Sequence, residues 1–99
     1  MTFENKSIKK NEPRIDKTIQ DSLELYFNNL GEQKPHAVLQ MVIGAAEKST
    51  VEFVLKKTKH NISLTSQILG ITRSTLRKKI SKHKILVRNK YSTSKNIIN

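Results

Sequence analysis

The chain has 99 residues, 35% of them hydrophobic, with five aromatic residues, no cysteine and a formal net charge of +11 at pH 7. A chain this short holds one domain with a small core, so we expect oligomerisation to supply part of its buried surface. The lack of cysteine excludes disulfides, thiolate catalysis and cysteine-ligated zinc. No apolar run is long enough to cross a bilayer or to serve as a secretory signal, so we expect a cytoplasmic protein with no membrane partner.

The charge is divided unevenly along the chain. Residues 1–52 contain seven basic and eight acidic residues, whereas residues 53–99 contain twelve basic residues and no acidic one. A basic region of this kind binds polyanions because neutralised phosphates release their condensed counterions. The asymmetry therefore predicts a protein-contacting first half and a second half that binds nucleic acid.

The first half is predicted to be helical after a flexible arm at residues 1–15. Apolar residues recur at helical spacing from Asp16 to Leu30, where Asp16 or Thr18 is suited to cap the helix and Gly31 to end it. Pro35 suits the first turn of a second, long helix from about His36 to Thr58. The main apolar face of that helix comprises Val38, Leu39, Val42, Ile43, Ala46, Thr50, Phe53 and Val54.

The long helix is apolar on more than one side, because Met41, Val51 and Leu55 lie outside its main face. A short chain cannot easily cover so much apolar surface alone. We therefore predict that residues 16–58 form a homodimer, although the same face could instead belong only to an intramolecular core. The predicted interface residues are Leu23, Phe27, Val38, Leu39, Val42, Ile43 and Ala46.

Residues 59–86 are predicted to form a helix-turn-helix. Gly70 can adopt the left-handed conformation that ends a first helix, and Thr72 can cap a second helix that starts at Arg73. Asn61 or Ser63 is suited to cap the first helix. In the packing that we expect, Leu76 and Ile80 form the buried stripe of the second helix, Ser66 permits close approach, and the partners are Leu64, Ile68 and Leu69.

The second of these helices has a polar, cationic side that is typical of a recognition helix in the major groove. On a helical wheel one arc contains Arg73, Ser74, Arg77, Lys78 and Ser81. The alternative is a solvated basic helix of an ordinary bundle. Beyond it, Ile85, Leu86 and Val87 are predicted to cover the end of the bundle, and residues 87–99 to form a basic tail that adds phosphate contacts.

The block GITRSTLRKKISKHKI, preceded by a long helix and by a helix that contains YFNNL, resembles the bacterial Fis (factor for inversion stimulation) proteins over about residues 17–86. The resemblance implies an all-α, four-helix homodimer with a C-terminal helix-turn-helix. It also implies a nucleoid-associated transcriptional regulator that bends duplex DNA at degenerate sites.

The resemblance also assigns individual contacts. Arg73 and Lys79 are expected at base edges, and Thr72 stands where the family usually has an asparagine, at a position expected to help choose the base. Position on the helix adds Ser74 and Lys82 to the phosphate contacts that the family implies. The expected phosphate contacts are then Asn61, Ser63, Ser74, Thr75, Arg77, Lys78 and Lys82.

Three departures from the family pattern stand out. Leu64 replaces a phosphate-binding arginine, and Ser49 replaces a proline that kinks the long helix. The N-terminal arm is short and lacks the alternating apolar pattern of the hairpin that activates DNA invertases, so we do not expect an interaction with invertases.

Enzymatic chemistry has no support in the sequence. The histidines His36, His60 and His83 are too scattered to indicate a metal or catalytic cluster, and there is no glycine-rich phosphate loop or nucleophile–base pair. We predict no enzyme activity, no metal and no cofactor. Two alternative functions remain open, a gene-specific regulator with the same fold and an RNA-binding protein, but the basic half lacks an aromatic stacking platform.

Overall fold

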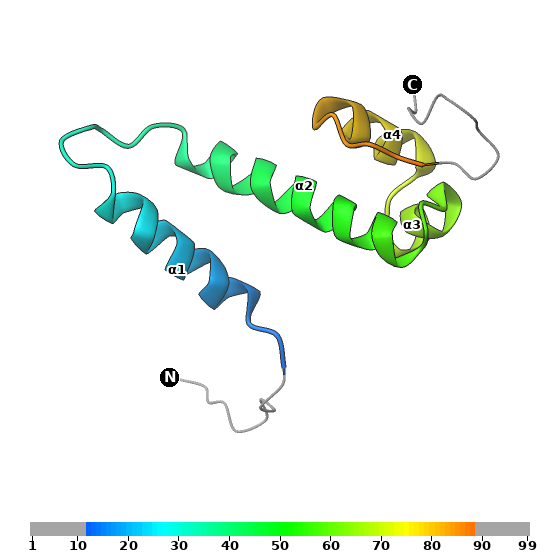
Figure 1. Cartoon of the computed structure of the whole chain (residues 1–99), viewed down its shortest axis with the longest axis horizontal. Helices are drawn as coiled ribbons and strands as arrows, with labels where there is room; N and C mark the ends of the chain where they lie inside the picture. The colour runs from blue at the N-terminus through cyan, green and yellow to red at the C-terminus, as the bar shows by residue number, and fades with distance from the viewer. Residues whose placement is uncertain (1–11, 89–99) are drawn as a thin grey trace. The chain divides into compact units, whose positions relative to one another are not determined.

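The computed structural model describes residues 12–88, which form four α-helices (Figure 1). The helices are α1 (Ile15–Asn28), α2 (Val38–Lys57), α3 (Ile62–Leu69) and α4 (Arg73–Lys82). No strand occurs in residues 12–88, and the all-α prediction is confirmed. The chain divides into two compact units, Met1–His36 with α1 and Ala37–Asn99 with the other three helices. Most of the predicted arm and nearly all of the predicted tail lie outside the described residues.

Helix α1 begins without a side-chain cap. Arg14 occupies the cap position and makes no capping hydrogen bond, so the predicted cap by Asp16 or Thr18 is wrong. Both residues lie inside the first turn, where Asp16 accepts a 3.3 Å bond from Arg14 Nε and the Thr18 hydroxyl donates to the Arg14 carbonyl. After the helix, Gly31 has a φ of +65°, the left-handed conformation that a glycine allows at a chain reversal.

Helix α2 starts later than its sequence suggests. Ala37 precedes it with a left-handed φ of 50°, so Pro35 lies in the connection and its predicted place in the first helical turn is wrong. The helix continues through Ser49 to Lys57 without a break. Only its C-terminal half contains buried residues, Val51 and Leu55.

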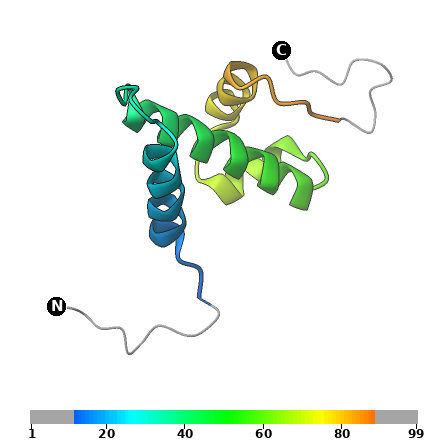
Figure 2. The ribbon, with the colours of Figure 1, turned by 60° about the vertical axis from the view of Figure 1, so that its left-hand side comes forward.

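The core of the second unit forms where α3 and α4 pack against the C-terminal half of α2, as the two ribbon views show (Figures 1 and 2). Ile62, Leu69 and Ile71 pack against it and are partly buried. The buried apolar residues are Val51, Leu55, Leu76, Ile80, Ile85 and Val87. The predicted stripe of Leu76 and Ile80 is thus confirmed.

The face that α3 turns to this core differs from the predicted one. Leu64 and Ile68 are 42% and 56% exposed, so their predicted packing against Leu76 and Ile80 is wrong, whereas Leu69 does contact the core. At 3.6 residues per turn, the inward face instead contains Ile62, Leu69 and two small polar residues between them, Thr65 and Ser66. Ser66 is buried, which agrees with the prediction that its small side chain lets the two helices approach closely.

The turn from α2 to α3 contains two consecutive left-handed residues, Lys59 and His60, each of which costs about 1–2 kcal/mol. A threonine pair stabilises this turn. The hydroxyls of Thr58 and the fully buried Thr65 lie 2.7 Å apart, and the Thr58 hydroxyl also accepts from the Asn61 amide. This pairing satisfies the buried hydroxyl and fixes the entry into α3.

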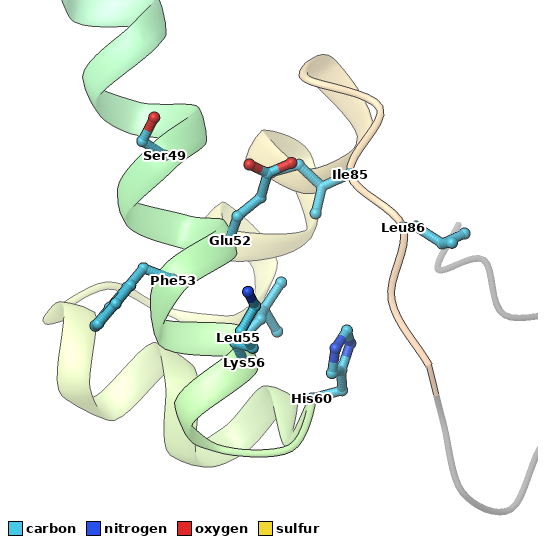
Figure 3. Close-up of a pocket in the computed structure, with 8 residues that line it drawn as sticks. All are labelled: Ser49, Glu52, Phe53, Leu55, Lys56, His60, Ile85 and Leu86. Carbon is cyan, nitrogen blue, oxygen red and sulfur yellow. The ribbon is translucent and has the colours of Figure 1, made fainter.

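The segment after α4 closes the core. Ile85 and Val87 are buried while Leu86 between them is 62% exposed, as expected for an extended segment. Figure 3 shows Ile85 directed toward α2 and Leu86 directed away from it. The Arg88 amide donates a 2.9 Å hydrogen bond to His60 Nδ1. The predicted cover is therefore confirmed for Ile85 and Val87, and the core extends one residue into the segment assigned to the tail.

Candidate nucleic-acid interface

The start of α4 is fixed by local sequence. Gly70 ends α3 with a φ of +76°, and the Ile71 amide reaches back 3.1 Å to the Ser66 carbonyl. Thr72 Oγ1 then accepts a 3.0 Å bond from the Thr75 amide. The predicted turn and cap are both confirmed, and they place the first turn of α4 at the surface.

The starts of α3 and α4 lie close together. Asn61 caps α3 by accepting a 3.0 Å bond from the Leu64 amide, which uses its Oδ1 and leaves its Nδ2 donors for other partners. The Arg73 guanidinium donates to Ser63 Oγ at 3.4 Å across ten residues of sequence. A predicted base contact and a predicted phosphate contact are thereby neighbours.

The polar arc of α4 is exposed along its length. Arg73, Ser74, Arg77 and Lys78 are exposed and Thr75 is half-buried, while Leu76 and Ile80 face the core. Lys82 is also exposed, at 66% of its side chain. Residues 53–88 contain no acidic residue, so α4 itself contributes only cationic and neutral side chains to this face.

The Thr72 hydroxyl is already engaged on both sides. It accepts from the Thr75 amide and donates to Thr75 Oγ1 at 3.1 Å. The Thr72 hydroxyl would have to break its hydrogen bond to Thr75 Oγ1 before it could donate to a base edge.

Lys79 lies apart from the exposed arc. Its Nζ is 2.7 Å from Glu47 Oε2 on α2, and His83 Nε2 is 3.0 Å from Glu47 Oε1. Lys82 Nζ is farther away, at 3.9 Å. Hydrogen bonds from His83 and Lys79 lower the pKa of Glu47 from its usual 4.5 to about 2, so the carboxylate is ionised at neutral pH.

Glu47 is not among the site residues predicted from the sequence. Lys79 and His83 are four residues apart and share a side of α4, which is a usable signal. No sequence rule connects them to a carboxylate 32 residues earlier, because that pairing depends on how α4 packs against α2.

The predicted interface residues lie on α1 and on the first half of α2. Leu39 is 71% exposed, and Phe27 and Ile43 are nearly half exposed. Ala46 is exposed, and Leu23, Val38 and Val42 are half-buried. None of these residues belongs to the buried core of the chain.

Within residues 12–88, no three histidine or acidic side chains gather in a way that could hold a metal ion. None of the four helices has the length and apolar character needed to span a bilayer.

Known proteins resemble most of the chain. Residues 43–83 match the family described as "Bacterial regulatory protein, Fis family". A putative Fis-like DNA-binding protein of Ralstonia nicotianae is 40% identical over 72 residues, which cover 73% of this chain and 94% of that protein. A putative Fis-like DNA-binding protein of Neisseria meningitidis serogroup A is 38% identical over 74 residues, covering 75% and 94%. The DNA-binding protein Fis of Proteus mirabilis is 30% identical over 66 residues, 67% of each chain. The chain therefore belongs to the Fis family of bacterial regulatory proteins.

Proposed function

We propose that this protein is a DNA-binding regulator, not an enzyme, and that it inserts α4 into the major groove of duplex DNA. The observation that carries this proposal is the exposed cationic side of α4, which begins beside the capped start of α3. A helix with donors near its N-terminus and cations along its flank suits a groove between two phosphate strands. The names of the similar proteins favour the same function.

The predicted contacts divide by role. Arg73 reads a base edge, because its guanidinium can pair with both acceptors of a guanine, and Thr72 lies beside it at the start of the helix. Lys79, the other expected base contact, is bonded to Glu47 in the free protein. The proposed phosphate contacts are Asn61, Ser63, Ser74, Thr75, Arg77, Lys78 and Lys82.

The protein acts as a homodimer built from residues 16–58. The apolar residues that α1 and the first half of α2 leave exposed support this, since a second copy of the same helices would cover them. Two copies would also present two α4 helices to two half-sites of a duplex.

Binding bends the duplex at degenerate sites, and the protein regulates transcription as part of the bacterial nucleoid. The excess of twelve basic residues after Glu52 supports bending, because cations beyond the groove attract flanking DNA toward the protein. The protein then selects its sites largely by how easily their base-pair steps deform and less by direct contacts to the bases.

Two variants of α4 test this function. Arg73→Ala should weaken binding by about 1–3 kcal/mol at the cognate base and reduce the preference for the best site, whereas Lys78→Ala should weaken all sequences alike and reduce the salt slope by about one. Equilibrium binding to a selected and to a random duplex at several salt concentrations measures both effects. A uniform loss in both variants would contradict base reading by Arg73.

Competition with bulk DNA and with structured RNA separates the proposed function from the alternatives. An architectural protein should prefer its best sites only modestly, whereas a gene-specific regulator should show a large specificity ratio. Higher affinity for structured RNA than for duplex DNA would favour the RNA-binding function instead.

A further inference from the structure

Glu47 is a residue of α2, and its carboxylate lies beside the C-terminal end of α4, where Lys79, His83 and Lys82 all present nitrogen atoms to it. The carboxylate bonds to Lys79 at 2.7 Å and to His83 at 3.0 Å, one oxygen for each. Its side chain is 26% exposed, that of Lys79 29% and that of His83 11%. These contacts are shielded from solvent far more than the surface ion pairs of α1, whose side chains are more than half exposed.

Apolar packing is incomplete at this edge of the interface. A hollow lies here between α2 and the turn before α4, lined by Ala46, Thr50, Val51, Leu69 and Ile71 as well as by Glu47 and Lys79. Leu76 and Ile80 anchor α4 on its core side, and a contact on another side of the helix adds resistance to rotation about its axis. The bonds to Glu47 supply a restraint against that rotation.

The rotation of α4 sets the direction of Arg73. Arg73 and Lys79 lie on different sides of one rigid helix, so a change that lengthens the Lys79–Glu47 contact also moves Arg73 relative to the surface. The Thr72 cap fixes where α4 begins, and the Glu47 contacts fix its far end.

We propose that Glu47 is a positioning residue of the DNA-binding surface, which orients α4 through Lys79 and His83 so that Arg73 points into the groove. This inference rests on the proposed function. It also assigns Lys79 a structural role: its ammonium group is bonded to Glu47 and contacts neither a phosphate nor a base edge, the contact that the family resemblance implies. Lys82 is mostly exposed and 3.9 Å away, and it remains available to the backbone of the duplex.

Four variants test the proposal: Glu47→Gln, Lys79→Gln, the double variant of both, and Glu52→Gln as the matched control. Glu52 lies on the same helix and forms an ion pair with Lys48 of that helix, at 4.0 Å. Glu52→Gln therefore removes the same charge without touching α4. The probes are the duplex that the wild-type protein selects from a random library and a random-sequence duplex of equal length.

Glu47→Gln and Lys79→Gln should each lower the ratio of selected to random affinity by about threefold to tenfold. The affinity ratio of the double variant should fall by no more than that of the more affected single variant, because both substitutions break the same Lys79–Glu47 contact. Glu52→Gln should leave the ratio unchanged. Lys79→Gln should also leave the salt slope unchanged, whereas a lost phosphate contact lowers it by about 0.9.

A double variant that loses more than the larger single loss would overturn the proposal, because Lys79 would then have a DNA contact of its own. Two further results of the binding measurements would also overturn it. One is a fall of about 0.9 in the salt slope of Lys79→Gln, which would make Lys79 a phosphate contact. The other is a Glu47→Gln variant whose affinity ratio matches that of Glu52→Gln.

Amide hydrogen exchange in the free protein separates failure of this proposal from failure of the proposed function. Glu47→Gln should speed exchange in the last turn of α4 whether or not the wild-type protein binds DNA. Unchanged exchange would reject the anchoring role, and a wild-type protein that binds no duplex would reject the function alone.

Discussion

Residues 12–46 and residues 47–88 both contain many apolar side chains but use them differently. The first region contains no buried residue, and Ile15, Leu25 and Leu39 are each more than 60% exposed. The second region contains all six residues of the apolar core. An apolar helix face need not pack against another element of its own chain. The C-terminal half of α2 contributes Val51 and Leu55 to the core, whereas the N-terminal half contributes no buried residue.

Charge separates the same two regions. Residues 12–46 contain three basic and five acidic residues, and residues 47–88 contain eleven basic and two acidic residues. A near-neutral apolar surface can approach a copy of itself with little repulsion, whereas the strongly positive region repels its copy unless an anion lies between them. The comparison favours self-association in the first region and DNA binding in the second.

A charge in the proposed interface should have the largest effect. Val42→Glu places an unpaired carboxylate among apolar residues, which costs about 3–5 kcal/mol of association free energy. We expect a monomer by sedimentation equilibrium, with the helix-turn-helix still folded because Val42 is not in its core. Gln40→Glu, on an exposed position of the same helix, is the control and should remain a dimer. A stable Val42→Glu dimer would refute this interface.

A cavity in the core should have the next largest effect. Leu76 is fully buried, so Leu76→Ala should lower the free energy of unfolding by about 2–5 kcal/mol. Ile68→Ala on α3, which is 56% exposed in the chain, should change it by no more than about 0.5 kcal/mol. Denaturant unfolding of the two variants compares them, and equal losses would place Ile68 in a covered surface.

The smallest expected effect is a dependence on pH in the second region. Burial, with a smaller contribution from Arg88, lowers the pKa of His60 below 6.5, so the native state favours the neutral ring. Its contribution to stability is therefore complete above about pH 6.5 and is lost as the pH falls through the lowered pKa. Protonation also removes the Nδ1 acceptor of the Arg88 amide.

Thermal unfolding at about pH 8 and about pH 5 measures this dependence. His60→Gln should lose less stability than the wild-type protein between these values. Equal losses in the two proteins would show that other groups cause the decrease.

Sequence predicts the helix-turn-helix well because its signals are local. Gly70, Thr72 and Asn61 act within three or four residues of their own positions, and the structure shows each in its predicted conformation or cap. The same reasoning was wrong for Pro35 and for the start of α1, where more than one residue could begin a helix.

Contacts between helices were harder to predict. Periodicity identified several apolar sides on α2 but could not say that Val51 and Leu55 would meet the helix-turn-helix. Leu64 and Ile68 were assigned inward because they are large and apolar, yet the geometry of α3 turns Thr65 and Ser66 inward. The Glu47 contacts were missed for the same reason, since they join residues that only tertiary packing brings together.

The segment after α4 belongs to the helix-turn-helix unit. The match to the family stops at residue 83, but Ile85 and Val87 complete the core and the Arg88 amide bonds back to His60. The match to the family is thus shorter than the segment that builds the core. Grafting the DNA-binding part onto another protein therefore requires residues through Arg88. A chain cut at residue 83 would lose Ile85 and Val87 and expose the core residues that they cover.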